Sequence, residues 1–255
     1  MELNESKLNL LIDACASTKK SVLIADIESG EIFFEREIDT LFRSASTIKT
    51  PMMAYALREC MLGNRSIDDK ITIGEPLSDS RIFDRGDDTA SIWKLLYFMI
   101  TVSDNTATNV IIREFGFDSL NSYFRSIGME KTTLRRKMLD WDAVANGFEN
   151  ETTNREMFVL FRTLFCGGLL DTPYTDHAKT ILSAQQDKSL ILRYIDREVV
   201  AYHKTGGLDN LVHDCGVFQL GDNHLYIGVF TDGAPDVSAK CGEQLCGAVG
   251  ELVLC

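Results

Sequence analysis

The order of strand-like and helix-like segments along the chain is the feature that most constrains its fold. Apolar runs bounded by turn residues predict five strands near the two ends of the chain, at 21–27, 31–35, 198–203, 215–220 and 224–231. In the middle of the chain, apolar residues recur instead at the spacing of helices. Strands at both ends imply a sheet assembled from both termini, with a helical part inserted between them.

Helical spacing predicts helices at 4–18, 51–63, 91–102, 105–115, 118–127, 154–166, 173–182 and 237–254. We therefore predict an α/β (α+β) fold, an antiparallel sheet flanked by the terminal helices plus an inserted all-helical lobe. We expect one domain over 1–255, with a sheet lobe at about 1–45 and 185–255 and a helical lobe at about 46–184. Segment 131–153 has little periodicity and is predicted to be a long ordered loop, which in compact domains is usually functional.

Charge excludes several classes of function. The chain carries 26 Lys and Arg against 38 Asp and Glu, a net charge of −12. This charge repels nucleic-acid phosphates and anionic lipids, so we expect neither nucleic acid nor a membrane as a partner. It also favours a monomer that stays soluble. The N-terminus lacks the basic and apolar segments of a signal peptide, so the chain as given is expected in the cytoplasm, and outside the cell only if a leader was removed.

The seven cysteines form no C-x-x-C pair, and their number is odd. Disulfide frameworks favour an even number in a short chain, and zinc sites favour closely spaced Cys and His. We therefore predict mostly buried, reduced thiols and no metal site. The glycine-rich nucleotide-binding motifs and the zinc-hydrolase motif are absent, so no cofactor is expected.

A serine–lysine motif is the first candidate for catalysis. S-x-x-K occurs three times, at Ser17, Ser46 and Ser91, but only Ser46 lies where a polar stretch meets the start of a predicted helix. There the hydroxyl can face a cleft while its own backbone N–H points at a developing oxyanion. Lys49 follows one turn later on the same face, and a partly desolvated lysine near other cations can act as a base. Taken alone, the motif fits better a helix N-cap at Ser46 with a solvated lysine.

Two further motifs flank predicted elements. Ser103-Asp104-Asn105 connects two predicted helices, and alone it could be an N-cap cluster. Lys204-Thr205-Gly206-Gly207 closes a predicted apolar strand, where a turn would explain the glycines but not the lysine and threonine. Together with the Ser46 motif, and in this order, they match the S-x-x-K, S-D-N and K-T-G set of class A β-lactamases and penicillin-binding proteins.

The chain resembles the class A β-lactamase family and its serine-hydrolase relatives. FRSASTIKTPMMAYAL is similar to the family's nucleophile helix, SDNTATNVIIREFG to its S-D-N segment, and HKTGG to its strand beside the site. The two-lobed arrangement also matches, so the resemblance spans nearly the whole chain. It implies a β-lactamase/transpeptidase-like fold and acyl-enzyme chemistry.

The resemblance implies a role for each matching residue. Ser46 would be the acylated nucleophile and Lys49 its proton acceptor, while Ser103 would pass a proton toward the leaving nitrogen. Lys204 would polarise Ser103 and attract the substrate carboxylate. Three more residues would bind substrate. Asn105 would bind its side-chain amide, and Thr205 would bind its carboxylate. The N–H groups of Gly207 and Ser46 would together bind the oxyanion. The same set also follows from acyl transfer itself, which needs a nucleophile, a base, a proton donor and two fixed N–H donors.

Two positions depart from the family's pattern. The family's loop carries a glutamate that activates the deacylating water, and Met138 falls at that position. Asp140 or Asp142 could substitute if the loop is shifted, or both could be solvated. We expect the loop's ion pair to join Arg136 and Glu151. The family's arginine beyond the K-T-G strand has no match, and His213 is the nearest candidate for its substrate-binding role.

We therefore expect a serine hydrolase that opens β-lactam rings through an acyl-enzyme on Ser46 and deacylates slowly. Its substrate would be a small β-lactam, or a peptide or ester. A D-alanyl-D-alanine carboxypeptidase or another amidase or esterase would use the same serine–lysine site. A penicillin-binding protein that acylates without turnover is the other alternative.

Overall fold

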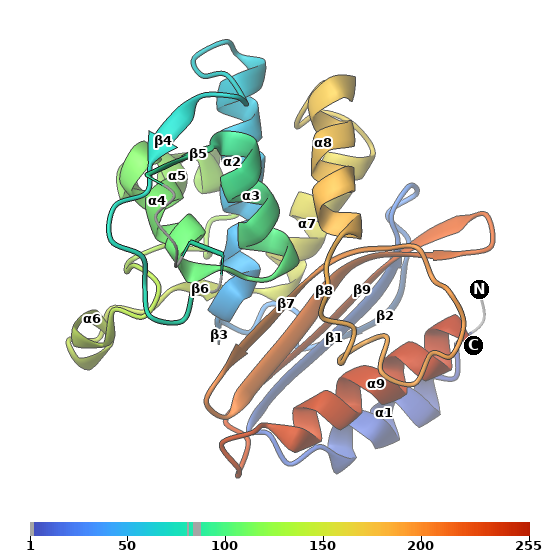
Figure 1. The fold of residues 1–255 in the computed structure, drawn as a ribbon. Coiled ribbons are helices and arrows are strands. Elements are labelled where there is room, and N and C mark those ends of the chain that lie inside the picture. Colours follow the sequence, from blue (N-terminus) through green and yellow to red (C-terminus); the bar gives the residue numbers. More distant parts are fainter. Residues whose placement is uncertain (1–2, 81, 84–87) are drawn as a thin grey trace.

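A five-stranded antiparallel sheet in the order β2-β1-β9-β8-β7 organises the molecule (Figure 1). The computed structural model describes residues 3–80, 82–83 and 88–255. The predicted sheet built from both ends of the chain is confirmed, because its strands are β1 (Lys19–Asp26), β2 (Ile32–Arg36), β7 (Ala201–Leu208), β8 (Leu211–Leu220) and β9 (Asn223–Asp232).

The two terminal helices cover one face of this sheet. Helices α1 (Glu5–Ala14) and α9 (Lys240–Leu254) lie side by side beneath it (Figure 1). Leu8 and Ile12 of α1 are fully buried there, in one cluster with Val249 of α9 and the outer-face residues of the strands. The helical spacing of these residues in the sequence is what gives each helix its apolar face.

The remaining elements build the helical lobe. Its longer helices are α2 (Lys49–Met61), α3 (Ile92–Thr101), α4 (Asn105–Phe115), α5 (Phe117–Ser126), α7 (Asn154–Phe165) and α8 (Thr172–Ser183). Its short elements are β3 (Phe42–Arg43), the 3₁₀ helix η1 (Ala45–Ile48), β4 (Lys70–Thr72), β5 (Thr89–Ser91), α6 (Trp141–Ala145) and β6 (Glu151–Thr152).

Helix α7 joins the helical lobe to the inner face of the sheet. The rings of Phe158 and Phe161 lie 5.2 and 5.9 Å from that of Tyr226 on β9. Asn154 donates hydrogen bonds to the Ser21 hydroxyl and to the Gly228 carbonyl, both at 3.0 Å. A Cβ on Gly228 would lie 2.1 Å from the Asn154 side-chain oxygen, so only glycine permits this approach. These contacts fix the lobes relative to one another.

The structure differs from the sequence prediction in two segments that bear on the site. Lys204-Thr205-Gly206-Gly207 lies inside β7 instead of closing it, while 198–200 precede the strand. The reason is that the motif continues to pair with β8, as in Lys204 with Cys215. The segment 131–153, predicted to be a loop, contains α6 and β6, and α6 protrudes from the molecule (Figure 1).

The cysteines agree with the prediction of reduced thiols, since all seven are free and Cys15, Cys60, Cys215 and Cys246 are buried. Within the described part of the chain, no helix is both long enough and apolar enough to cross a lipid bilayer.

Candidate active site

Ser46 lies in a tight turn between the lobes. It belongs to η1, directly before α2, and its side chain is partly exposed. Ala45 before it has φ 45°, a left-handed conformation that non-glycine residues rarely adopt and that clusters at functional sites. A Cβ on Gly206 would lie 3.1 Å from the Ser46 main-chain nitrogen. The glycine of the K-T-G motif therefore lets strand β7 pack against the turn that carries Ser46.

Lys49 begins α2 and is completely buried. Its ammonium donates to the Ser103 carbonyl at 2.7 Å, to the Ser103 hydroxyl at 3.1 Å and to the Asn105 side-chain oxygen at 2.8 Å. Burial, and next the charge of Lys204, hold the pKa of Lys49 well below its usual value. The first and second motifs of the sequence therefore meet at a lysine that loses its proton easily.

The Ser103-Asp104-Asn105 segment is held rigidly between α3 and α4. Ser103 has φ 58°, a second left-handed residue at the site. Asp104 is the N-cap of α4, accepting from the Ala107 N–H at 2.7 Å, and its other oxygen accepts from the Ser80 hydroxyl at 2.7 Å. The N-cap alternative therefore applies to Asp104, which leaves the hydroxyl of Ser103 on Lys49.

Lys204 is the second buried lysine of the site. Its ammonium donates to the Thr205 carbonyl at 2.8 Å. Burial lowers its pKa to about 8, although Asp187 and Asp214 act in the opposite direction. Burial raises the pKa of Asp187, but hydrogen bonds from Ser189 and Thr205 and the charge of Lys204 lower it below its ordinary value. The charges of Lys204 and Asp187 therefore stabilise one another at this end of the site.

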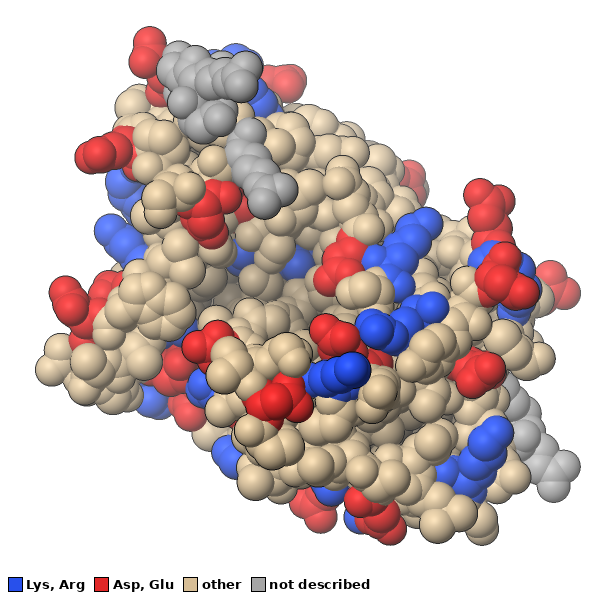
Figure 2. Space-filling view, turned by 60° about the horizontal axis from the view of Figure 1, so that its bottom comes forward, with Lys and Arg blue, Asp and Glu red and all other residues tan. Residues whose placement is uncertain are grey.

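The three motifs line a common cavity of about 350 Å³ between the lobes. Figure 2 shows a hollow on this face of the molecule, with acidic and basic side chains interspersed around it. Gly207 is exposed, and a Cβ there would meet nothing within 4 Å. The lining residues include Ser46, Ser103, Asn105, Asp187, Ser189, Leu190, Thr205, Gly206, Gly207, Val212 and Glu243.

Met138 lies beside Ser46 in an adjoining cavity of about 90 Å³, whose lining also includes Asn105, Trp141 and Gly207. The side-chain amide of Asn109 holds the backbone of Met138, accepting from its N–H at 2.8 Å and donating to its carbonyl at 3.1 Å. Met138 is only 7% exposed. The loop position predicted for the water-activating group therefore lines a cavity together with Ser46, and it carries a thioether.

The two aspartates considered as substitutes lie further along the loop. The Asp140 carboxylate accepts from the Ala143 N–H at 3.0 Å and caps α6. Asp142 is exposed on α6. Neither Asp140 nor Asp142 is among the described residues that line the two cavities.

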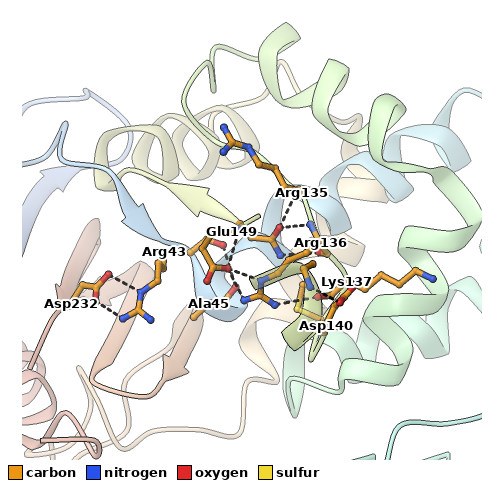
Figure 3. Close-up of polar contacts among 12 residues, drawn as sticks. Arg43, Ala45, Arg135, Arg136, Lys137, Asp140, Glu149 and Asp232 are labelled. Atoms are coloured by element: carbon orange, nitrogen blue, oxygen red, sulfur yellow. Dashed lines mark hydrogen bonds and ion pairs between the residues drawn. The ribbon is translucent and has the colours of Figure 1, made fainter. Parts of the chain in front are cut away.

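The predicted ion pair of the loop is corrected by the structure. Arg136 pairs with Glu149, at 2.6 and 2.7 Å, and not with Glu151 (Figure 3). Glu151 instead lies 3.5 Å from Arg135. The reason is that Glu151 is in β6, where its side chain lies beside the neighbouring arginine, while Glu149 lies before the strand and reaches Arg136.

His213 is placed within the sheet. It is completely buried; its Nε2 contacts the Arg43 carbonyl at 2.7 Å, and its Nδ1 accepts from the Thr231 N–H at 3.2 Å. Burial lowers its pKa to about 4, and its ring stacks on that of Phe230 at 4.5 Å. Its position gives no support to the predicted substrate-binding role, because both ring nitrogens are occupied by main chain. Arg43 beside it is paired with Asp232 (Figure 3).

Sequence reasoning missed four polar residues that organise the site. Asp79 accepts from the Asn105 amide at 2.7 Å, and Asn150 accepts from the main chain of Arg135 and Arg136 at 2.7 and 3.0 Å. The others are Asn109 and Asp187. Only Asn109 carried a usable signal, because it follows Asn105 by one helical turn on the same face. Across the described residues, no cluster of three or more His, Cys, Asp or Glu could hold a metal ion.

Comparison with known proteins agrees with this geometry. The family model described as "Beta-lactamase enzyme family" matches residues 4–254. The chain belongs to the β-lactamase enzyme family. This confirms the family that the three motifs predicted. Membership also agrees with the prediction of a hydrolase.

Individual relatives in the β-lactamase family are distant in sequence. The β-lactamase FAR-1 of Nocardia farcinica is 29% identical over 161 residues, 60% of this chain and 50% of the relative. The β-lactamase AST-1 of Nocardia asteroides is 27% identical over 182 residues, 68% of this chain and 57% of the relative. The matched part of this chain thus spans about half the length of these curated relatives.

Solved structures share the fold over nearly the whole chain. A β-lactamase from Sphaerobacter thermophilus is 28% identical, with a TM-score of 0.87 over 99% of this chain and 97% of that chain. The TLA-1 extended-spectrum β-lactamase is 18% identical, with a TM-score of 0.88 over 98% of this chain and 96% of that chain. The β-lactamase/transpeptidase-like fold class is therefore confirmed.

Proposed function

We propose that this protein is a serine hydrolase that opens β-lactam rings through an acyl-enzyme on Ser46 and releases that acyl group slowly. One observation carries the proposal. Ser46, Ser103 and the K-T-G strand line one cavity, with buried Lys49 bonded to Ser103 and buried Lys204 on that strand, while Met138 lines the adjoining cavity with Ser46. The first part is suited to acylation, and the second removes a base from deacylation.

Acylation begins with the Ser46 hydroxyl, which attacks the lactam carbonyl while its proton passes to the neutral amine of Lys49. Neutral Lys49 is available because burial and Lys204 depress its pKa. The N–H groups of Ser46 and Gly207 hold the oxyanion. Gly207 suits this role because it is an exposed residue of the edge strand β7, beside the cavity.

Ring opening then breaks the C–N bond, and the nitrogen needs a proton. The Ser103 hydroxyl supplies it and is reprotonated from Lys49, to which it is already hydrogen-bonded at 3.1 Å. Lys204, charged below a pH of about 8, attracts the substrate carboxylate at this end of the cavity. Asn105 binds the substrate's side-chain amide. Asp79 orients Asn105 by accepting a hydrogen bond from the amide nitrogen of Asn105. In the free protein the Thr205 hydroxyl is engaged by Asp187, so a substrate carboxylate would compete for it.

Deacylation requires a water molecule to lose a proton as it attacks the ester. The thioether of Met138 cannot accept that proton. Asp140 caps α6 and Asp142 is exposed, so neither is positioned to replace it. General-base assistance is typically worth about 10²–10⁴-fold. We therefore propose the acyl-enzyme as the resting state with penicillins.

The test is intact-mass spectrometry after mixing the protein with a penicillin, with product release followed in parallel. We expect a burst of one equivalent, slow turnover, and a persistent adduct mapped to Ser46. Ser46→Ala should lose the adduct, whereas Ser17→Ala and Ser91→Ala, which alter the other two S-x-x-K serines, should keep it. An adduct that persists in Ser46→Ala contradicts the assignment of the nucleophile.

A second candidate is a penicillin-binding protein or D-alanyl-D-alanine peptidase that uses the same groups. Met138 favours it, because a β-lactamase depends on fast deacylation. PBP-A shares the fold at 22% identity with a TM-score of 0.85, and a PBP-A variant is described as an acyl-enzyme complex with penicillin G. Release of D-alanine from a peptide ending in D-alanyl-D-alanine, with no hydrolysis of a chromogenic cephalosporin, would favour this candidate.

A further inference from the structure

Two cysteines from opposite ends of the chain meet on the outer side of the sheet. Cys15 directly follows α1, and Cys241 lies in the first turn of α9. Helices α1 and α9 lie side by side there, so the end of one reaches the start of the other (Figure 1). The Ser17 hydroxyl contacts both sulfurs, at 3.6 Å from that of Cys15 and 3.4 Å from that of Cys241. The Cys15 thiol donates to the Ser17 hydroxyl, so this hydroxyl bridges the two sulfurs.

We propose that Cys15 and Cys241 form a redox-active thiol pair that a peroxide oxidises to a disulfide. The pair lines a different cavity from the one that Ser46 lines, although Glu243, two residues after Cys241, lines the cavity of Ser46. It is therefore a modification site separate from the residues proposed for the acyl-enzyme chemistry.

The surroundings of the two sulfurs differ as an attacking and a resolving thiol require. Cys15 is 5% exposed, and burial raises its pKa. Burial also acts to raise the pKa of Cys241, but hydrogen bonds from the Ser17 hydroxyl and from the N–H groups of Ala16 and Ser17 help to lower it overall. The start of α9 adds a positive potential at the same place. Cys241 is therefore the more readily ionised of the two thiols.

A small oxidant has access to both sulfurs. Cys15 and Cys241 line one open cavity of about 250 Å³, and Cys241 is partly exposed. The rest of its lining is largely apolar and includes Leu11, Ala14, Tyr194, Gln244, Leu245 and Ala248. A neutral peroxide can enter such a cavity, whereas a bulky anionic oxidant is disfavoured.

The reaction balances in two steps. The Cys241 thiolate attacks one peroxide oxygen, the O–O bond breaks, and the leaving hydroxide takes a proton to form water, which leaves Cys241 as a sulfenic acid. The Cys15 sulfur then attacks the Cys241 sulfur, the S–O bond breaks, and the hydroxide leaves with the Cys15 proton as a second water. Two thiols are oxidised and one peroxide is reduced to two waters. The disulfide would tie α1 to α9 and constrain most of the chain in the unfolded state.

The experiment uses the full chain with Cys166→Ser and Cys255→Ser, which remove the two exposed thiols. After an equimolar amount of hydrogen peroxide, the intact mass should fall by two hydrogens, and peptide mapping should link Cys15 to Cys241. Dithiothreitol should reverse both changes, and the oxidised form should melt at a higher temperature than the reduced form. A mass that does not change, or a disulfide mapped to another pair, would overturn the proposal.

Two matched variants in the same background separate the roles of the thiols. Cys15→Ser keeps the attacking thiol without its resolving partner, so Cys241 should accumulate as a sulfenic acid that dimedone traps. Cys241→Ser should slow oxidation of Cys15 by at least about tenfold, since that thiol is buried and protonated. Circular dichroism establishes that each variant is folded. Equal oxidation rates in the two variants contradict the assigned roles.

Discussion

At the scale of single residues, two buried lysines set the chemistry of the cleft. Both are completely buried, and burial is the largest cause that lowers the pKa of each. Lys49 is held by three oxygen acceptors that are all uncharged, so nothing in direct contact with it restores the preference for the ammonium form. Lys204 keeps more of its charge because Asp187 and Asp214 lie nearby. We therefore expect Lys49 to act as a base and Lys204 to act as a cation.

Replacing Lys204 should slow acylation. Lys204→Ala removes the cation that attracts the substrate carboxylate and polarises Ser103, and the acylation rate with a penicillin should fall by at least about tenfold, or about 1.4 kcal/mol of barrier. Stopped-flow measurement of the burst gives this rate. Unchanged kinetics in a folded variant would show that the K-T-G segment serves only the packing of β7.

The pH dependence of acylation follows from the same residue. The pKa of Lys204 is lowered to about 8, so it is charged below that pH and loses its charge above it. The second-order rate constant for acylation, which reports the free enzyme, should therefore fall as the pH rises through about 8. Arginine stays charged throughout this range, so Lys204→Arg should move this alkaline limb to higher pH. An identical limb in both proteins would assign it to another group.

Met138 is expected to limit deacylation. Asn109 fixes the backbone of Met138, which lies beside Ser46. Met138→Glu should therefore place a carboxylate close to the ester. We expect this carboxylate to speed the slow phase by up to about 10²–10⁴-fold, the range typical of a general base. Loss of the adduct is followed by mass spectrometry after excess penicillin is removed. Met138→Gln is the matched control and should leave the slow phase unchanged. Slower release in Asp140→Asn would show instead that this aspartate has taken over.

At the scale of elements, the loop that carries Met138 depends on two anchors. Asn150 accepts from the main chain of Arg135 and Arg136, while its own carbonyl accepts from the Ser44 N–H at 2.7 Å. This ties the loop to the turn that carries Ser46. Arg136, only 5% exposed, supplies the second anchor through Glu149 (Figure 3). The loop therefore keeps its place although its family glutamate is missing.

The two ion pairs of this loop should contribute unequally to stability. Glu149→Gln leaves the buried Arg136 without its carboxylate and should lower the free energy of unfolding by about 2 kcal/mol. Glu151→Gln makes the same chemical change opposite Arg135, which is half exposed, and should cost no more than about 0.5 kcal/mol. Urea denaturation of both variants measures the difference. Equal losses of unfolding free energy would show that the Arg136–Glu149 pair stabilises the protein no more than an exposed ion pair does.

At the scale of the whole molecule, burial of basic groups in the sheet makes stability depend on pH. His213 on β8 has a pKa of about 4 in the folded state, whereas its ordinary value is 6.5. Between these values the unfolded chain binds more protons than the folded one, so stability falls as the pH is lowered. The ring stays neutral between Phe42 and Phe230, because it is completely buried and no solvent can stabilise its protonated form.

From pH 7 to pH 5, the His213 contribution to the free energy of unfolding should fall by about 2 kcal/mol. His213→Gln removes the titrating group, and its free energy of unfolding should decline by correspondingly less over the same range. Urea denaturation at both pH values measures the two differences. Parallel declines in the two proteins would assign the loss to carboxylates.

From the sequence alone, the class of fold and most helices could be predicted. Asn105–Phe115 was predicted with its observed bounds, because the helix depends on a local N-cap, regular apolar spacing and a closing glycine. The convergence of Ser46, Ser103 and Lys204 followed from the resemblance to a known family, since these residues lie far apart in the chain. Spacing within one element is a local property, and a sequence records it directly.

The partners that meet across elements become visible only in the folded molecule. It paired Arg136 with Glu149, closed Asn109 on Met138, buried His213 between two aromatic rings and brought Cys15 to Cys241. Each of these depends on the path of a loop or on how a helix seats on the sheet. Such a path is set by the packing of the whole core, so shifting a loop by two residues changes the partner without changing any local pattern.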